Sequence, residues 1–173
     1  MKNGAQSSQV RLRRSAPDDL AFVTALERHP DNRDWIGQWS DDEHLAAIAG
    51  KQAREHWIIE RDGESAGYLV AYDCRAAGAG VYVKRILVKD KSRGTGRAAL
   101  ALFIEEASRR FAPVAVWLIV HETNARALKV YRSLGFERFE PGGDSQLYDA
   151  AAEPPRDSEY FRMRLVRPEG ELS

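Results

Sequence analysis

The sequence predicts one α/β domain with a mixed sheet, in which an antiparallel meander is followed by a β-α-β unit. Three apolar segments between residues 56 and 88 are joined by turns too short for a parallel crossover. A glycine-rich turn, a segment with helical periodicity and an unbroken apolar run come next, and this order makes one right-handed parallel unit. The 173 residues show no repeat and no domain boundary, so we expect the domain at residues 10–167, with tails at 1–9 and 168–173.

The domain begins with a strand and two helices. Val10–Arg14 is the strand, and Ser15 is the expected N-cap of a helix whose first turn contains Pro17. We predict a loop over Pro30–Trp39 and then a second short helix that Ser40 caps.

The meander follows, with its strands separated by the turn signals RDGE and RAAGAG. Its three strands are His56–Glu60, Ala66–Tyr72 and Gly80–Val88. In the third strand, Val81 and Val83 share one face. Ile86 and Val88 have even numbers, so in a regular strand they would lie on the face opposite to Val81 and Val83. A phase slip of this kind indicates a β-bulge, which we place near Lys84–Ile86.

The second half contains two further helices and three strands. Apolar residues from Leu100 to Phe111 recur at helical spacing, which predicts an amphipathic helix. Val114–Val120 is apolar throughout, as in a strand that is covered on both faces. A helix over Asn124–Leu134 ends at Gly135, which suits the left-handed C′ position. The late strands are Phe136–Glu140 and Tyr160–Val166.

Composition argues against several classes of protein. The 26 basic and 26 acidic residues balance, so no overall positive field favours nucleic acid, and any anion site must be local. No apolar run approaches the roughly 20 residues of a membrane span, and the polar N-terminus lacks the apolar stretch of a signal peptide. The single cysteine, Cys74, excludes an internal disulfide, and the four histidines have no metal-ligand spacing. We therefore expect a cytoplasmic protein that binds no metal, nucleic acid or membrane.

The turn KDKSRGTGRAAL, Lys89–Leu100, joins a strand to a helix and is suited to holding a phosphate. Gly94 and Gly96 let an anion approach converging backbone N–H groups at the positive end of the helix. Three basic side chains would add charge-assisted hydrogen bonds: Lys91, Arg93 and Arg97.

Three phosphate ligands are candidates for this turn. The nucleotide pattern GxxxxGK[ST] is absent. The dinucleotide pattern GxGxxG/A is matched by Gly94, Gly96 and Ala99, but it follows an antiparallel meander instead of the first strand of a dinucleotide fold. The third candidate is the pyrophosphate of coenzyme A. An ordinary glycine turn on a solvated basic surface is the alternative that the turn alone leaves open.

A second motif decides between these alternatives. The segment VHETNARALKVYRSLGFERFE resembles the end of the acetyl-CoA-binding region in the GNAT family of N-acetyltransferases. The family pattern N-x-x-A-x-x-x-Y-x-x-x-G-F is matched by Asn124, Ala127, Tyr131, Gly135 and Phe136. The glycine turn looks like the family's Q/R-x-x-G-x-G/A loop, with Lys91 in the place of Gln or Arg, and the resemblance extends over Val10–Val166.

The resemblance implies transfer of an acetyl group from acetyl-CoA to a primary amine by direct attack. The pantetheine arm would run between two splayed parallel strands and pair with backbone groups beside the bulge. An N–H near Leu87 or Val88 would face the thioester oxygen. The residues that the resemblance assigns to coenzyme A are Ile86, Leu87, Val88, Lys91, Arg93, Gly94, Thr95, Gly96, Arg97 and Asn124.

Tyr131 is the general acid by its position in the family pattern. It follows Asn124 by seven residues, close to two helical turns, so both side chains share one face of the helix. The alternative for Tyr131 is a packing residue beside Leu128 and Leu134, and the alternative for Asn124 is a helix cap, which is compatible with contacting coenzyme A.

No general base is assigned. The family places a glutamate five residues before the motif asparagine or early in the bulged strand, but Ile119 and Tyr82 occupy those places. His121 and Glu122 are the nearest titratable substitutes, and Asp73 with a chain of waters is a further option.

The acceptor is not identified, but two acidic segments border its expected site. Six acidic residues lie between residues 140 and 159: Glu140, Asp144, Asp149, Glu153, Asp157 and Glu159, with Arg156 the only basic one. The loop between the first helices adds Asp31, Asp34, Asp41, Asp42 and Glu43. Trp35 and Trp39 of this loop either line the acceptor pocket or pack the loop. We predict a small-molecule amine or peptide acceptor, and a cationic one if these loops steer it and are not simply solvated.

Two other functions remain open alternatives. The missing glutamates suit a GNAT-fold module that binds acyl-CoA, with acetyl or a longer acyl group, without catalysing transfer. The dinucleotide pattern leaves a dinucleotide-binding oxidoreductase, which binding of NAD without coenzyme A would reveal. The sequence is compatible with a monomer or a homodimer.

Overall fold

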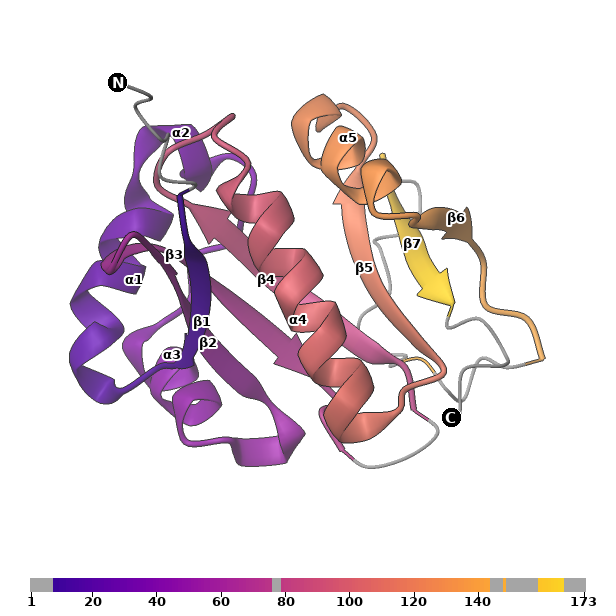
Figure 1. Cartoon of the computed structure of the whole chain (residues 1–173), viewed down its shortest axis with the longest axis horizontal. Coiled ribbons are helices and arrows are strands. Elements are labelled where there is room, and N and C mark those ends of the chain that lie inside the picture. Colours follow the sequence, from indigo (N-terminus) through magenta and orange to yellow (C-terminus); the bar gives the residue numbers. More distant parts are fainter. Residues whose placement is uncertain (1–7, 76–78, 144–147, 149–158, 167–173) are drawn as a thin grey trace, which may run out of the picture.

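A computed structural model describes residues 8–75, 79–143, 148 and 159–166, which form one mixed α/β domain around a seven-stranded sheet (Figure 1). The strand order is β1-β2-β3-β4-β5-β7-β6. The strands are β1 (Val10–Arg14), β2 (Glu55–Arg61), β3 (Glu64–Tyr72), β4 (Val81–Val88), β5 (Ala115–His121), β6 (Glu137–Phe139) and β7 (Tyr160–Val166). The helices are α1 (Leu20–Arg28), α2 (Pro30–Arg33), α3 (Asp41–Ile48), α4 (Thr95–Phe111) and α5 (Ala125–Ser133), with short 3₁₀ turns at Pro17–Asp19 and Lys51–Ala53.

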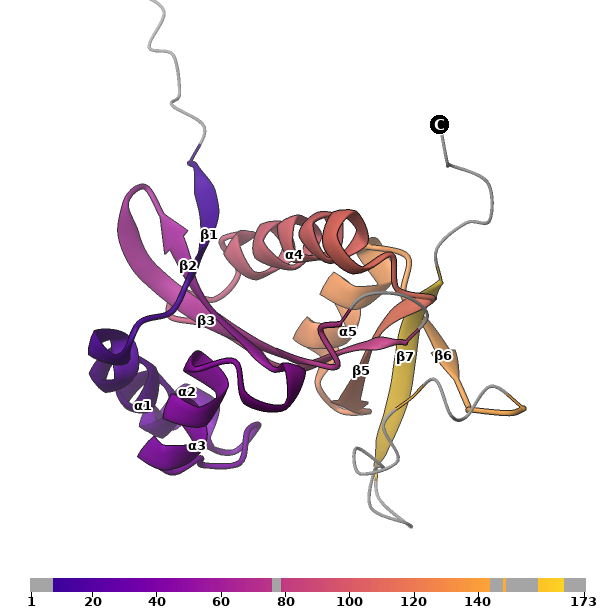
Figure 2. The same cartoon turned by 90° about the horizontal axis from the view of Figure 1, so that it is seen from below.

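The helices form layers on both faces of the sheet. Figure 2 shows α4 and α5 on one face and α1, α2 and α3 on the other. On the α4 face, Leu100 and Phe103 pack on a core that includes Trp57. On the α1 face, Val23 and Leu26 pack on residues of β2 and β3. The sheet is therefore buried on both faces along β2–β4, which explains the long apolar runs of these strands.

The predicted bulge is confirmed in β4. The register of β3 with β4 shifts between Val70, opposite Arg85, and Ala71, opposite Val83, so Lys84 is the extra residue. Beside the bulge, β3 approaches β4 so closely that a Cβ on Gly67 would collide with the carbonyl oxygen of Leu87.

The parallel pair of β4 and β5 is also confirmed, and it splays. Their ladder consists of Val81 with Val116 and Tyr82 with Trp117. Beyond Tyr82 the edge of β4 that faces β5 has no ladder partner among the described residues. Apart from the carbonyl oxygen of Val88, which accepts from Lys91, the backbone of Ile86–Val88 on this edge is therefore available to an extended ligand.

Two local predictions are wrong. Ser15 does not cap the first helix, because its Oγ lies 2.7 Å from His56 Nδ1; the chain enters α1 through the 3₁₀ turn at Pro17, where the backbone N–H of Ala16 bonds Asp19 Oδ2 at 2.8 Å. The segment Pro30–Trp39 is not all loop, since α2 starts it. Proline at the first helical position and His29, whose Nδ1 accepts from the N–H of Asp31, favour this turn.

Other local predictions are confirmed. Ser40 and Glu43 form a reciprocal capping box at the start of α3. Gly135 follows α5 with φ of +90°.

Residues 1–7 and 168–173 of the expected tails lie outside the described residues, as do Asp144, Asp149, Glu153, Arg156 and Asp157 of the acidic segment. In the part of the chain that is described, no helix is long and apolar enough to span a membrane, and no three His, Cys, Asp or Glu side chains gather as a metal site.

Candidate active site

A cavity of about 450 Å³ lies where β4 and β5 separate. Its walls are Val83–Val88 of β4 and Ile119–His121 of β5, and residues of α5 together with Trp35 and Ile36 complete the lining. The sequence-derived site residues that line it are Ile86, Leu87, Val88, Lys91, Gly96, His121, Asn124 and Tyr131. Those that do not line it are Arg93, Gly94, Thr95, Arg97 and Glu122.

The glycine turn is held in place by a residue that sequence reasoning missed. Arg61 Nη1 donates to the carbonyl oxygen of Arg93 at 2.8 Å and to Thr95 Oγ1 at 2.7 Å. Gly94, at φ of +75°, is the N-cap of α4, and Thr95 is buried behind it. Thr95 therefore anchors the turn, while the backbone N–H groups at the start of α4 are left without helical partners.

Lys91 lines the cavity but also bonds the protein itself. Its Nζ donates to the carbonyl oxygen of Val88 at 2.8 Å and to Oδ1 of Asn32, a buried residue of α2. Burial, together with the nearby charge of Arg126, lowers the pKa of Lys91. In this arrangement the lysine ties the glycine turn to α2.

The other predicted phosphate ligands lie on the surface of the turn. Arg93 Nη1 is 3.5 Å from Asp90 Oδ2, and Arg97 Nε donates to Ser133 Oγ at 3.0 Å, which connects α4 with α5. Both arginines are exposed, so their positive charges face solvent beside the turn.

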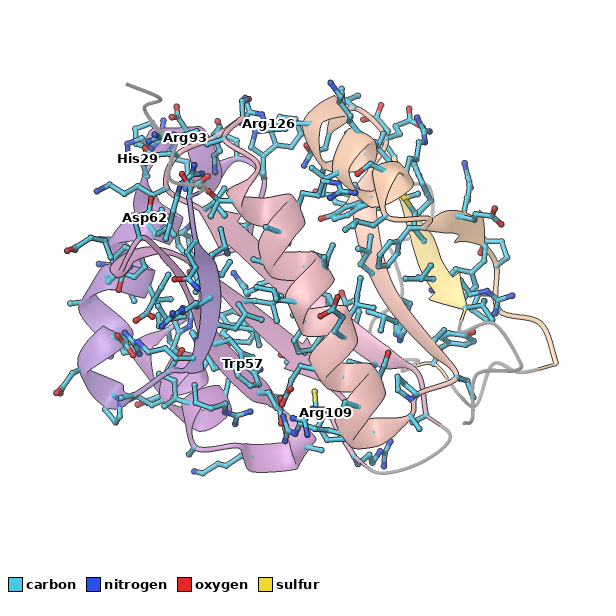
Figure 3. All side chains as sticks on the ribbon, in the orientation of Figure 1. His29, Trp57, Asp62, Arg93, Arg109 and Arg126 are labelled. Atoms are coloured by element: carbon cyan, nitrogen blue, oxygen red, sulfur yellow. The ribbon has the colours of Figure 1, made fainter. Side chains whose placement is uncertain are left out.

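Arg126 is a second basic residue that sequence reasoning missed. It lies in the first turn of α5 and lines the cavity. Figure 3 shows Arg93 and Arg126 at the same edge of the molecule, one on the glycine turn and one on α5. A cation in the first turn opposes the helix dipole, so an arginine there is itself a signal of a nearby anion site.

Asn124 and Tyr131 occupy one face of α5 at the cavity. Asn124 caps the helix, since its Oδ1 accepts from the N–H of Ala127 at 3.2 Å. Burial raises the pKa of Tyr131 to about 12. The phenol therefore carries its proton at neutral pH, which a proton donor requires.

His121 also lines the cavity, just before the start of α5, and both of its ring nitrogens are engaged. Nδ1 accepts from the backbone N–H of Thr123 at 3.2 Å and lies 2.7 Å from Thr123 Oγ1, while Nε2 lies 3.0 Å from Glu159 Oε2. With Nδ1 as an acceptor, the neutral ring carries its proton on Nε2, toward Glu159. His121 has no lone pair directed into the cavity in this arrangement, and Glu122 is exposed away from it.

No carboxylate occupies the places where the family pattern expects one. Ile119 lines the cavity, and Tyr82 is buried and stacked on Trp117 with ring centroids 4.3 Å apart. Asp73 pairs with Arg75 at 3.0 Å and does not line the cavity. Of the described carboxylates, Asp31 of α2 is the one at the cavity wall.

Three exposed or partly exposed rings border the mouth on the Trp35 side. Trp35 is 52% exposed and its ring centroid lies 6.2 Å from that of His121, edge to face. His121 packs at 4.7 Å against Tyr160, which is 38% exposed. Trp39, by contrast, packs against His44 and Tyr72. Trp35 therefore lines the cavity, while Trp39 packs the loop.

Solved structures with this fold include several acetyltransferases. The spermidine N-acetyltransferase from Vibrio cholerae, in complex with CoA and spermine, is 16% identical with a TM-score of 0.70, covering 91% of this chain and 95% of that chain. An aminoglycoside acetyltransferase in complex with coenzyme A is 18% identical with a TM-score of 0.69, covering 92% and 95%. The ribosomal-protein-S18-alanine N-acetyltransferase from Escherichia coli is 21% identical with a TM-score of 0.65, covering 95% and 99%.

At these identities the likeness concerns the fold, and no curated protein has a sequence that matches this chain. The sequence itself matches the acetyltransferase (GNAT) family over residues 19–136. This match includes both the glycine turn and the Asn124–Phe136 motif that border the cavity. Because it spans more than half of the chain, the chain belongs to the acetyltransferase (GNAT) family.

Proposed function

We propose that this protein transfers an acetyl group from acetyl-CoA to a primary amine by direct attack. The observation that supports this most strongly is the cavity between the splayed strands, which is bordered by an unpaired strand edge, a helix N-terminus with basic residues and a protonated tyrosine. A phosphate end and a reacting end are thus present in one cavity. Similar folds have been solved with CoA or acetyl-CoA bound, which supports the same cosubstrate.

Different residues of the cavity bind the cosubstrate, stabilise the developing charge and donate a proton. The glycine turn and Arg126 hold the phosphates, and the open edge of β4 from Ile86 to Val88 pairs with the pantetheine. The backbone N–H of Val88, on the side of β4 away from β3, donates to the thioester oxygen as negative charge develops on it. The amine attacks the carbonyl carbon in its neutral form, the carbon–sulfur bond breaks, and Tyr131 donates its proton to the departing thiolate.

The proton of the amine leaves through solvent at the mouth. This assignment follows from His121, whose two nitrogens are occupied by Thr123 and Glu159. The open rings of Trp35 and Tyr160 leave the mouth accessible to water. A water that accepts this proton can pass it to bulk solvent.

The test is release of free thiol from acetyl-CoA across a panel of amines, with acetylated products identified by mass spectrometry. Transfer to at least one amine is the expected result. Tight CoA binding without transfer to any amine would instead favour a non-catalytic acyl-CoA-binding module, which the absence of carboxylates at Ile119 and Tyr82 motivates. Binding of NAD without CoA would exclude both.

Arg126→Gln is expected to weaken CoA binding, because a positive charge at the cavity wall is lost. The loss should be about tenfold at low salt, equivalent to roughly 1.4 kcal/mol, and it should shrink as salt screens the phosphates. Calorimetric titration with CoA at two salt concentrations measures it. Lys129→Gln is the matched control, since Lys129 is exposed on the same helix and does not line the cavity. Equal affinities of the two variants would remove Arg126 from the phosphate site.

We further propose that the acceptor is cationic. At the mouth, the carboxylate of Glu159 beside His121 accompanies the exposed rings of Trp35 and Tyr160, and aromatic faces attract cations. Arg85, which also lines the cavity, is neutralised by Glu27. Two similar folds are named for spermidine and aminoglycosides, which are cationic amines.

For two matched amines that differ only in a charge remote from the nucleophile, the cationic one should have the higher kcat/KM. The preference should be several-fold at low salt and should decline at high salt, because steering by an exposed carboxylate is screened. The measurement compares kcat/KM for both amines at the two salt concentrations. A preference for the anionic amine, or a preference that salt does not change, would contradict a cationic acceptor.

A further inference from the structure

We propose that a buried ion pair, Glu27 with Arg85, positions the acceptor-side wall of the cavity. The wall is the segment Asp34–Trp39 between α2 and α3, called here the acceptor loop, and it carries Trp35 and Ile36. Glu27 and Arg85 are positioning residues, which act on the acceptor through this loop. This inference rests on the proposed acetyl transfer for its kinetic consequences, but not for its structural ones.

Arg85 makes three contacts that hold the loop to the sheet. Its Nη1 donates to Glu27 Oε1 at 2.8 Å and to the carbonyl oxygen of Gly37 at 2.6 Å. Its guanidinium lies over the ring of Trp39, 4.3 Å from the centroid. One arginine of β4 therefore binds both a backbone group and a side chain of the acceptor loop.

Glu27 holds the same loop from α1. Its Oε2 accepts from the backbone N–H of Trp39 at 3.2 Å, and its backbone carbonyl accepts from Gln38 Nε2 at 3.1 Å. Together with Arg85, these bonds anchor Gly37, Gln38 and Trp39 in succession. The loop is thus fixed directly after the two residues that line the cavity.

The β-bulge places Arg85 on the correct side of the sheet. Val83 packs on the α4 face, so regular alternation would put residue 85 on that apolar face too. The extra residue Lys84 shifts the phase, and Arg85 instead points toward α1 while Ile86 packs on the α4 face. The same bulge therefore provides the anchor of the loop and borders the cavity.

The contribution of the ion pair to stability does not by itself account for its deep burial. Glu27 is 1% exposed and Arg85 is 5% exposed, and a buried ion pair contributes little more to stability than apolar residues of the same size. Burial alone would raise the pKa of Glu27, but His44 Nε2, which lies 3.3 Å from Oε1, the hydrogen bond from Tyr68 and the charge of Arg85 hold it below the usual value. Glu27 is thus a fully bonded anion and not a free base. What the pair adds is a defined position for the loop.

Trp35 needs such an anchor, because it is 52% exposed and its ring meets His121 edge to face with centroids 6.2 Å apart. Its wall faces the expected path of the amine, and a displacement of about 1 Å in a positioned reactant can lower a rate about 100-fold. Loss of the anchor should therefore affect the acceptor, while the glycine turn keeps its place because Arg61 holds it independently of the loop.

The test uses the double variant Glu27→Leu/Arg85→Met, which replaces the two charges together and leaves neither one buried alone. We expect kcat/KM for the acceptor to fall about 10- to 100-fold, with an increase in KM and unchanged CoA affinity. Backbone amides of residues 34–39 should exchange hydrogen faster. Arg85→Lys, which keeps the charge but not the planar fork, should lie between the double variant and the wild type.

The matched control is Glu55→Leu/Arg110→Met, which removes an ion pair of the same length, 2.8 Å between Nη2 and Oε1, that is partly exposed, joins β2 to α4 and does not line the cavity. It should leave acceptor kcat/KM and exchange in residues 34–39 unchanged. A folded Glu27→Leu/Arg85→Met variant with wild-type acceptor kinetics and wild-type exchange overturns the proposal. If that variant does not fold, wild-type behaviour of Arg85→Lys overturns it. Absence of transfer in the wild type refutes the proposed function instead, and the exchange measurement still decides the role of the pair.

Discussion

The Tyr131→Phe protein is expected to bind CoA as the wild type does and to turn over about 10²–10⁴-fold more slowly. The change removes only the hydroxyl, so the ring keeps its place beside Phe136 and the cavity keeps its shape. The departing thiolate then lacks its proton donor. Single-turnover rates and CoA titration measure the two quantities separately.

The pH dependence provides the control for this variant. Burial raises the pKa of Tyr131 to about 12, and the active form is the protonated one below that pKa. Tyr131 should therefore cause no loss of rate between pH 7 and about pH 11, and any alkaline decline in this range should persist in Tyr131→Phe. A variant with full turnover, when chemistry limits the rate, would make Tyr131 a packing residue.

Gly96→Phe is expected to fold and to lose CoA affinity by at least about 100-fold, equivalent to roughly 2.7 kcal/mol. Gly96 lies in the first turn of α4 and lines the cavity. A Cβ built there meets only the methyl groups of Val88, at 3.7 and 3.9 Å, which is ordinary contact. The space beside Gly96 is therefore open in the free protein, and a large side chain would occupy the place of the ligand.

Gly96→Ala is the graded control. Alanine favours helix over glycine by about 1 kcal/mol, so this variant should be at least as stable as the wild type and should retain more CoA affinity than Gly96→Phe. Thermal unfolding and CoA titration compare the series. Wild-type CoA affinity in a folded Gly96→Phe protein would show that the glycine turn does not border the CoA site.

Local features of the fold were predictable because neighbouring residues determine them. The change in parity along β4 reported the bulge, and Ser40 and Gly135 marked helix ends through side-chain capping and a positive φ. Ser15 was mispredicted as a cap for the opposite reason. Its hydroxyl bonds His56, a partner 41 residues away that no local pattern can reveal.

In the candidate site, too, local motifs were predictable and contacts between residues far apart in the sequence were not. The glycine turn and the Asn124–Phe136 motif identify the family and the tyrosine at the cavity, because both are short segments with fixed spacing. Arg61 was missed, since its contact with Thr95 crosses from β2 to the glycine turn, 34 residues away. Arg126 was detectable in principle, as a cation that opposes a helix dipole.

By itself, the sequence determined the family, the order of the strands and of every helix except α2, and the bulge in β4, because periodicity, turn chemistry and motif spacing are local properties. Only the tertiary structure decided that His121 has both nitrogens engaged and that Lys91 bonds Asn32. It alone placed Glu27 against Arg85, 58 residues further along the chain, beneath the acceptor loop. These contacts depend on how α1 and α2 pack on the sheet, and packing joins residues whose distance in the sequence carries no signal.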